Sequence, residues 1–565
     1  KRQYQIYPRS FQDSDGDGIG DLNGITSRLD YIQSLGVDII WLNPIFLSPN
    51  DDNGYDISDY REIMREFGTM EDFDRLLKEI HKRGMRLVLD LVVNHTSDEH
   101  PWFEEARKSR HNPYYNYYHW WPAEKGEPPL RLSYFDEEGN AWMYNKSTDS
   151  YYLHYFSRKQ PDLNWENPEV RQEIFDMMRF WFDKGIDGFR MDSISLIAKD
   201  PSFPLIDSKK YPDIFSFYAK EPRLHLYLHE MNRQVLSKYD CMSVGEGSAV
   251  MVDDVAKFVD PAREELNMLY HFDAARIRNT TLPDNPESGI DYSLIALKKM
   301  FTEWDKAVDK GWPSIYLGNH DQPRMVSRFG SDKDEFRALS AKMLITFLLT
   351  MRGTPYWFAG DEIGMRNIRF DRIEDYNDID TINRYKKAKA EGKDPQAVLD
   401  EQKETGRDNA RTPFQWDRSP EAGFTAGTPW LKVNPDYTWI NVADEEKDPT
   451  SILNYFKKVV SFRKENPSLI YGSYHLLDAE NPQCYIFLRK TGADTYLIML
   501  NFSPKAAIST PGIDMSNAHV LLDNYGDRSH MAPQKDITLR PFEAIVFQLN
   551  HPVYESFIDS LDLLE

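Results

Sequence analysis

Eight short apolar runs recur between Tyr4 and Ala359, and helix-like stretches separate several of them. The runs are Tyr4–Phe11, Val37–Phe46, Arg86–Val93, Gly188–Ser193, Cys241–Gly245, Met268–Phe272, Ser314–Gly318 and Thr354–Ala359. Strands that alternate with helices indicate an α/β protein built from parallel βαβ units. Eight units over more than 300 residues favour a closed (β/α)8 TIM barrel. A doubly wound sheet is the alternative, but no glycine-rich phosphate loop follows any run.

Other patterns interrupt and follow this repeat. The 565 residues exceed one core of usual size, so several domains are expected. The segment between His95 and Asn167, rich in Trp, Tyr, Pro and His, predicts a subdomain inserted after the third strand. After about Tyr471, alternating strands indicate a C-terminal antiparallel β-sandwich domain. We predict the barrel in residues 1–95 and 167–472, the inserted subdomain in 96–166, the C-terminal domain in 473–550 and a tail in 551–565.

Composition restricts the class of partner. The chain is 41% hydrophobic and 28% charged, which is typical of a soluble globular protein. Its net charge of −23 argues against nucleic acid or an anionic membrane as a partner, because both need clustered basic residues. We expect a cytoplasmic monomer or weak homo-oligomer. A periplasmic location is the alternative, because the chain starts at Lys1 without a methionine.

Polar residues stand at the ends of four of the apolar runs. These ends are Asp90–His95, Arg190–Asp192, Glu246 and Asn319–Asp321. In a barrel of this type the C-terminal strand ends form the active site, so these groups should converge on one rim. Packing alone does not explain them, since unpaired buried charge is costly.

Carboxylates, histidines and an arginine without cysteine suit two chemistries. One is glycoside cleavage by paired carboxylates. The other is hydrolysis at a metal held by His and Asp. Neither an H-x-H nor an H-E-x-x-H pattern occurs at these strand ends, so the sequence favours glycoside cleavage.

At these residues the sequence resembles glycoside hydrolase family 13, the α-amylase family. The family's four short signatures match Asp90–His95, Gly188–Asp192, Glu246 and Asn319–Asp321 in order, and a fifth matches Gln160–Asn164. The QPDLN form of the fifth signature is similar to that of the oligo-1,6-glucosidase subgroup. Further matches cover nearly the whole chain: Tyr4–Phe11, Asn50–Tyr60, Gly406–Pro413 and Asn434–Tyr437. The resemblance implies a retaining α-glucosidase whose substrate is a disaccharide or short oligosaccharide.

The resemblance also implies a role for individual residues. Asp192 would be the nucleophile, Glu246 the general acid/base and Asp321 the stabiliser of the transition state. Arg190 would orient Asp192 and keep it ionised, since residues two apart on a strand share a face. Like charges would keep Glu246 protonated. The residues implied to bind the sugar or shape its pocket are Asp52, Tyr55, His95, Phe156, Arg190, Ser193, His320 and Arg407.

A loop near the start of the chain has the pattern of a calcium site. Asp13–Asp21 alternates oxygen-bearing side chains with a glycine at its sixth position, as in the front of an EF-hand loop. Gly24 stands where the bidentate glutamate would be. The resemblance implies a structural Ca²⁺ with the ligands Asp13, Asp15, Asp17, the Ile19 carbonyl and Asp21. The alternative is a Gly/Asp turn without an ion.

Two positions bear on which bond is cleaved and what the product is. Oligo-1,6-glucosidases typically have valine after the nucleophile, and relatives that prefer α-1,4 bonds have threonine or alanine. Ser193 matches neither, so we expect cleavage of α-1,4 bonds, α-1,6 bonds or sucrose. Sucrose isomerases are an alternative, although Asp273–Asn279 has two arginines without their RLDRD motif. A non-catalytic relative, such as a transporter-associated subunit, is a third hypothesis; such relatives carry a membrane anchor and typically lose these carboxylates.

Overall fold

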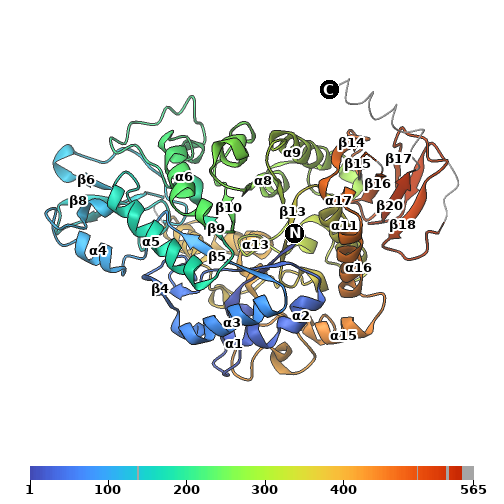
Figure 1. Cartoon of the computed structure of the whole chain (residues 1–565), viewed down its shortest axis with the longest axis horizontal. Coiled ribbons are helices and arrows are strands. Elements are labelled where there is room, and N and C mark those ends of the chain that lie inside the picture. Colours follow the sequence, from blue (N-terminus) through green and yellow to red (C-terminus); the bar gives the residue numbers. More distant parts are fainter. Residues whose placement is uncertain (137–138, 493, 530–533, 550–565) are drawn as a thin grey trace.

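Eight parallel strands form a nearly closed barrel in the computed structural model, which describes residues 1–136, 139–492, 494–529 and 534–549 (Figure 1). In sheet order the strands are β11 (Met268–Tyr270), β10 (Met242–Glu246), β9 (Gly188–Asp192), β5 (Arg86–Val92), β2 (Ile39–Leu42), β1 (Gln3–Ile6), β13 (Thr354–Phe358) and β12 (Ser314–Ile315). Ser314 Oγ joins the two end strands by donating to the Leu269 carbonyl at 2.8 Å. Each predicted run overlaps one strand of the barrel, and the predicted (β/α)8 fold is confirmed.

Alternating side chains point into the barrel and fill it. An apolar layer of Ile39, Trp41, Val88, Val244, Met268, Tyr270, Tyr316 and Tyr356 packs inside. Because side chains alternate between the two faces of a strand, the same parity turns Asp90, Arg190, Asp192 and Glu246 inward at the C-terminal ends. The lower layer is therefore an apolar floor for a charged upper layer.

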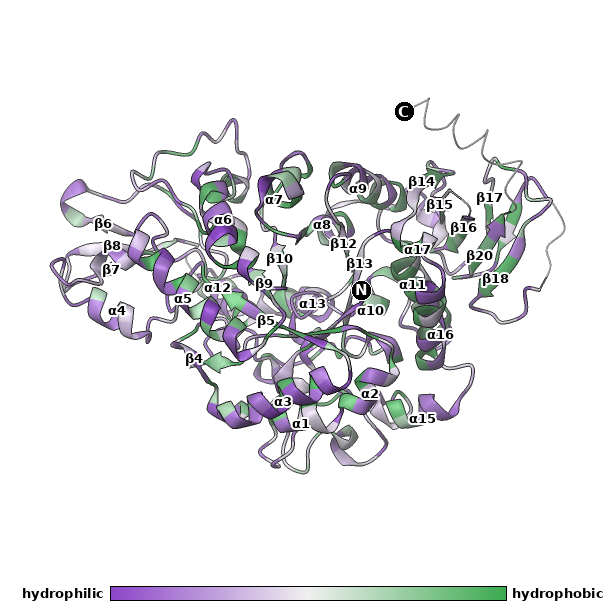
Figure 2. Ribbon diagram, in the orientation of Figure 1, coloured by the Kyte–Doolittle hydropathy of each residue, from purple (hydrophilic) through white to green (hydrophobic). Residues whose placement is uncertain are grey.

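Amphipathic helices cover the outside of the barrel, and Figure 2 shows green and purple bands alternating along α3, α5 and α6. The larger ones are α3 (Met70–Lys82), α5 (Pro168–Lys184), α6 (Arg223–Gln234), α9 (Leu294–Ala307) and α16 (Ile452–Glu465), whereas α11 (Arg337–Thr350) is buried on nearly all sides. Helix α3 starts at a capping box of Thr69 and Asp72. Its buried positions Phe73, Leu76, Leu77 and Ile80 follow the helical period.

Two excursions from the barrel shape its C-terminal rim. The first follows β5 and contains α4 (Pro101–Ala106) and an antiparallel sheet of β6 (Trp120–Pro122), β8 (Ser150–Leu153) and β7 (Trp142–Asn145). The Leu163 amide ties it to the barrel by donating to the Asn94 carbonyl at 2.9 Å. The second follows β13 and contains α12 (Ile379–Ala390) and α13 (Pro395–Thr405).

The C-terminal part is built of antiparallel sheets and lies at the opposite end of the molecule from β6–β8 (Figure 1). One sheet has the order β14 (Ser473–Leu477), β15 (Cys484–Thr491), β16 (Asp494–Asn501), β20 (Ala544–Leu549) and β18 (His519–Asp523). The other pairs β17 (Ala507–Ser509) with β19 (Ile537–Leu539). The boundaries that we gave for the domains stay predictions, and the tail of residues 551–565 lies outside the described residues.

Buried cations join the barrel to these sheets. Lys298 on α9 donates to the carbonyls of Asp478, Asn481 and Cys484 at 2.7–3.1 Å.

Cys484 and Cys241 are both free thiols. Among the described residues, no helix is both long and apolar enough to cross a membrane.

Candidate active site

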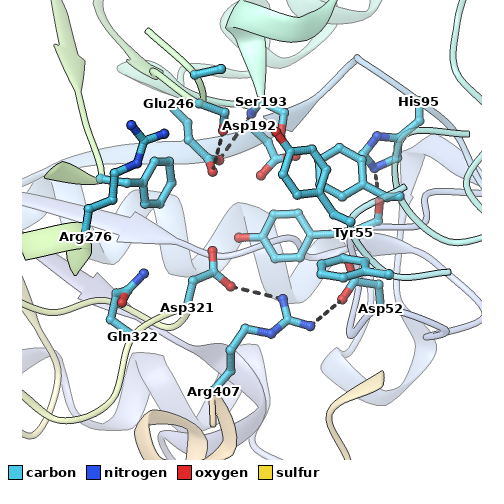
Figure 3. A pocket seen from close by; sticks show the side chains of 16 residues that line it. Asp52, Tyr55, His95, Asp192, Ser193, Glu246, Arg276, Asp321, Gln322 and Arg407 are labelled. Atoms are coloured by element: carbon cyan, nitrogen blue, oxygen red, sulfur yellow. Dashed lines mark hydrogen bonds and ion pairs between the residues drawn. The ribbon is translucent and has the colours of Figure 1, made fainter. Parts of the chain in front are cut away.

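A cavity of about 330 Å³ opens at the C-terminal ends of the barrel strands (Figure 3). Its lining consists of Asp52, Tyr55, His95, Tyr134, Phe135, Phe156, Asp192, Ser193, Glu246, Ser248, Ala249, Phe272, Arg276, Asp321, Gln322 and Arg407. Nine of the eleven residues that we predicted to act on or bind the sugar are in this lining. The other two, Arg190 and His320, are fully buried behind it.

The Arg190 guanidinium is the centre of the charged layer. Its Nη1 donates to Asp90 Oδ1 and Asp192 Oδ1, both at 2.8 Å, and its Nη2 donates to Glu246 Oε2 at 2.6 Å. Its Nε donates to the Tyr270 hydroxyl at 2.8 Å. One buried cation thus faces three carboxyl groups from three adjacent strands. Because one positive charge cannot neutralise three negative charges, repulsion among the carboxylates favours the protonated form of at least one of them.

The two carboxyls nearest the cavity respond differently to this surplus of negative charge. Burial raises the pKa of Asp192 to about 6, opposed chiefly by the Arg190 charge. Burial raises the pKa of Glu246 well above its ordinary value; Arg190 opposes that rise, and Asp192 and Asp321 add to it. A hydrogen bond between the two carboxyls lowers the pKa of Asp192 and raises that of Glu246. At neutral pH the pair is therefore an ionised aspartate beside a protonated glutamic acid.

Ser193, directly after Asp192, occupies the left-handed region of backbone conformation. Its φ is 44° and its ψ is 30°, which is uncommon for a residue other than glycine. This turn ends β9 sharply and aims the Ser193 amide at Glu246 Oε2, at 3.2 Å. The Ser193 side chain lines the cavity beside both carboxyls. Backbone strain of this kind clusters at functional sites, where the surrounding structure maintains it.

Asp321 and Asp52 lie at the far end of the cavity and share Arg407. Arg407 Nη1 contacts Asp321 Oδ1 and Nη2 contacts Asp52 Oδ1, both at 3.2 Å. Burial alone would raise the pKa of Asp321, but His320 and the guanidinium groups of Arg407 and Arg411 hold it below its ordinary value. Asp321 is therefore a fixed negative charge. Burial raises the pKa of Asp52 to about 6, although the positive charge of Arg407 lowers it.

The remaining predicted residues form a hydrogen-bonded wall. The Tyr55 ring stacks on His320 with centroids 5.3 Å apart, and its hydroxyl donates to Asp90 Oδ2 at 2.8 Å. His95 Nε2 donates to the Tyr55 carbonyl at 3.0 Å, and burial lowers the pKa of His95 to about 4. Phe156 tilts against His95 at 5.0 Å. His95 is therefore a neutral hydrogen-bonding group at physiological pH.

Several residues of the site were not predicted from the sequence. Tyr270 holds Arg190 together with Asp90, which we expected at the rim without a role, and Asp378 is the buried partner of Arg407. The parity of β11 could have shown that Tyr270 faces inward beside Glu246, with which it is in register. The other missed residues of the lining are Tyr134, Phe135, Ser248, Ala249, Phe272 and Gln322. Arg276, which we had considered only in the isomerase comparison, also lines the cavity.

The loop over residues 13–21 gathers part of the predicted calcium set. Carboxylate oxygens of Asp13, Asp15 and Asp21 lie within 4.8 Å of one another, and Asp17 is not part of this group. The loop packs closely on the segment over residues 424–430: Trp430 N donates to the Gly18 carbonyl at 3.0 Å. Gly18 has a φ of 87°, and a Cβ there would lie 1.8 Å from the Thr428 carbonyl oxygen, so only glycine fits.

Comparison with known proteins identifies the family. The model of the α-amylase catalytic domain matches residues 5–472. The oligo-1,6-glucosidase of Parageobacillus thermoglucosidasius is 52% identical over 560 residues, which cover 97% of this chain and 98% of that enzyme. The chain therefore belongs to the α-amylase family, and the predicted membership of glycoside hydrolase family 13 is confirmed. It is a glycoside hydrolase.

Solved structures of sucrose isomerases have the same fold. The trehalulose synthase of Pseudomonas mesoacidophila superposes with a TM-score of 0.91 at 43% identity, covering 97% of this chain and 98% of that one. The isomaltulose synthase of Protaminobacter rubrum also gives a TM-score of 0.91, at 42% identity, with the same coverage of both chains. Both synthases therefore share the full architecture of this chain, and the oligo-1,6-glucosidase matches its sequence over nearly the whole length.

The raised pKa of Glu246 predicts a pH-dependent gain of stability in Glu246→Gln. A carboxyl whose pKa is higher in the folded than in the unfolded chain stabilises the fold below its ordinary pKa of 4.5. This contribution is lost as pH rises through the folded-state value, but glutamine does not titrate. The unfolding temperature of Glu246→Gln, relative to wild type, should therefore increase from about pH 5 to about pH 8. Thermal unfolding across this range, with exposed Glu335→Gln as the control, measures it; a difference that stays constant contradicts the prediction.

Proposed function

We propose that this chain is a retaining α-glucosidase that releases terminal α-linked glucose from short oligosaccharides. The observation that carries the proposal is the pairing of Asp192 and Glu246 at the ends of adjacent strands, with opposite protonation at neutral pH. A retaining glycosidase needs one ionised carboxylate as nucleophile and one protonated carboxyl as acid. Arg190 binds both groups and favours the ionised form of each, and burial with the charges of Asp192 and Asp321 leaves the proton on Glu246.

In the first step, Asp192 attacks the anomeric carbon of glucose while Glu246 protonates the glycosidic oxygen, which leaves with the aglycone. The product is a covalent glucosyl-Asp192 intermediate. In the second step, Glu246 takes a proton from water, and the water oxygen displaces Asp192. The transition states are cationic, so the fixed negative charge of Asp321 stabilises them. The two displacements together retain the α configuration.

The remaining groups fit the recognition of one glucose residue. Arg407 with Asp52 and Asp321 closes one end of the cavity, which limits cleavage to a terminal sugar. Neutral His95 is suited to hydrogen bonds with hydroxyl groups, and Tyr55 and Phe156 offer ring faces. His320, buried behind the lining, contacts Tyr55 and Asp321 instead of the cavity. A cavity of about 330 Å³ suits a small ligand and not a polymer.

The nucleophile is tested by release of p-nitrophenol from p-nitrophenyl α-glucoside. Wild type should hydrolyse it, and Asp192→Asn should lose at least about 10³-fold in kcat because the amide cannot form the intermediate. The exposed Asp176→Asn on α5 is the matched control and should keep the wild-type rate. Absence of release by wild type would count against the glucosidase, whereas equal rates for wild type and Asp192→Asn would show that the nucleophile is another residue.

Ser193 is proposed to set the preference between bonds. A small side chain here leaves room beside the two carboxyls, which an α-1,4 linkage needs because its aglycone ring lies closer than in the longer α-1,6 linkage. Ser193→Val should therefore raise the isomaltose-to-maltose ratio of kcat/KM by about tenfold, the effect of one or two methyl groups in a pocket. Ser193→Ala removes the hydroxyl without adding bulk and is the control. A ratio in Ser193→Val that matches wild type would refute this assignment.

Sucrose isomerisation is the second candidate function, and the position of Arg276 in the lining of the cavity favours it. In this case the glucosyl-Asp192 intermediate would pass its glucose to the fructose just released instead of to water. Separation of the products from sucrose distinguishes the two reactions. Free glucose and fructose indicate hydrolysis, and isomaltulose or trehalulose indicates isomerisation.

We further propose that the Asp13–Asp21 loop binds a structural Ca²⁺. The three clustered carboxylates supply hard oxygen ligands, and Asp17 and the Ile19 carbonyl complete the proposed set. Partial burial and the charges of Asp15 and Asp13 raise the pKa of Asp17 to about 6. A bound cation would relieve this repulsion and fix the loop against the segment over residues 424–430.

Calcium should therefore stabilise the protein. The unfolding temperature in millimolar Ca²⁺ should exceed that in a chelator by about 2–5 °C, because a ligand bound only to the folded state stabilises it. Asp15→Asn, an exposed position whose change should not disturb packing, should abolish the difference. Equal unfolding temperatures for wild type in both buffers would support the alternative of a turn without an ion.

A further inference from the structure

Helices α12 and α13 bring Arg407 to the closed end of the cavity. Arg407 lies two residues after α13, and its guanidinium bridges Asp321 and Asp52 there (Figure 3). These two carboxylates come from the segments after β12 and β2, which β1 and β13 separate in the sheet. The direction of one flexible side chain therefore decides whether this end of the cavity is open or closed.

Asp378 holds that side chain from behind. It is the N-cap of α12, is fully buried and is not part of the cavity lining. Arg407 Nε donates to Asp378 Oδ1 at 3.1 Å and to Oδ2 at 3.0 Å, and Arg407 Nη2 also contacts Oδ1. Several contacts to one carboxylate fix the plane of a guanidinium as well as its position. In this orientation Nη1 faces Asp321, and Nη2 faces Asp52 as well as Asp378.

Asp378 is itself rigidly placed. Its Oδ1 accepts from the Asp380 amide at 3.1 Å, and its own amide donates to Asp408 Oδ2 at 2.9 Å. Helix α12 is also tied across the cavity to the inserted subdomain: Asn383 Nδ2 donates to the Phe135 carbonyl at 2.7 Å. The Arg407 guanidinium lies 4.9 Å from the centre of the Phe135 ring. The closed end is thus a bridge between the two excursions of the barrel.

We propose that Asp378 is a positioning residue that keeps Arg407 across the end of the cavity and so makes the enzyme select a free terminal glucose. The inference rests on the proposed glucosidase function and adds to it the residue that enforces the selection. Without Asp378, the carboxylates of Asp321 and Asp52 would still attract Arg407. Its guanidinium plane, and how far the group extends into the cavity, would no longer be fixed. Closure would then fail while the reacting pair at Asp192 and Glu246 stayed intact.

The test compares Asp378→Asn with Asp380→Asn. Both variants make the same chemical change at the start of α12, but Asp380 pairs with Arg384, which is not part of the cavity lining. With p-nitrophenyl α-glucoside, Asp378→Asn should raise KM about tenfold and change kcat by less than about threefold, the pattern expected for lost binding at a distance from the reacting bond. Asp380→Asn should match wild type.

A second substrate reports closure directly. In p-nitrophenyl α-glucoside blocked by a 4,6-O-ethylidene group, the added bulk points toward the closed end. Wild type should hydrolyse it poorly, and the blocked-to-unblocked ratio of kcat/KM should rise at least about tenfold in Asp378→Asn. A merely structural role for Asp378 would lower both rates together and leave this ratio unchanged.

Chemical rescue covers the case in which Asp378→Asn fails to fold. Added guanidinium ion should restore a low KM to Arg407→Ala, because Asp378, Asp321 and Asp52 still form its binding site. Rescue should be lost in Arg407→Ala/Asp378→Ser.

Three results would overturn the proposal: a wild-type KM in Asp378→Asn, an unchanged ratio for the blocked substrate, or equal rescue with and without Asp378. If wild type releases no p-nitrophenol from the unblocked substrate, the glucosidase function itself fails, which is a distinguishable outcome.

Discussion

The site depends on one buried cation facing more carboxyl groups than it can neutralise. Arg190 has no exposure to solvent and binds Asp90, Asp192 and Glu246. Taking these charges out of water is expensive, and their mutual attraction offsets the cost only when the hydrogen bonds are complete. Besides burial, the shortage of positive charge raises the pKa of Glu246, because its ionised form would lie beside the charges of Asp192 and Asp321. Glu246 therefore keeps the proton that a general acid needs.

The barrel strands fix the relative positions of Arg190 and its three carboxyl partners. Parallel strands in fixed register place Asp90 beside Arg190 and Glu246 beside Tyr270. Strand parity sends all of these side chains to the same inner face. The apolar layer below keeps water from the guanidinium, so the electrostatic interactions above it are strong. The carboxyl groups proposed to cleave the bond thus lie on the barrel strands, whereas Asp52 and Arg407, proposed to select the substrate, lie on its loops and excursions.

The groups on the barrel strands could be predicted from the sequence, and most of those on the loops and excursions could not. The eight strands and the groups at their ends follow from local patterns, and so do Asp192 and Glu246. Asp378 and Phe135 do not, because their place over the cavity is set by how the two excursions pack and not by any local period. Ser193 was noted for its side chain, whereas its left-handed backbone was not foreseen. The calcium loop shows a similar limit: its spacing indicates an ion, but only three of its carboxylates are brought together.

The closed end of the cavity has a consequence for how the protein is made. Arg407 meets Asp52 across 355 positions of the chain, and β1 at the start pairs with β13 near residue 354. A growing chain therefore lacks the partner strand of β1, and the Arg407 bridge to Asp52, until residues 354–407 have been synthesised. Contacts of such long range form late and slowly in folding. The charged rim of the barrel and the Arg407 bridge are consequently complete only after segments far apart in the sequence have met.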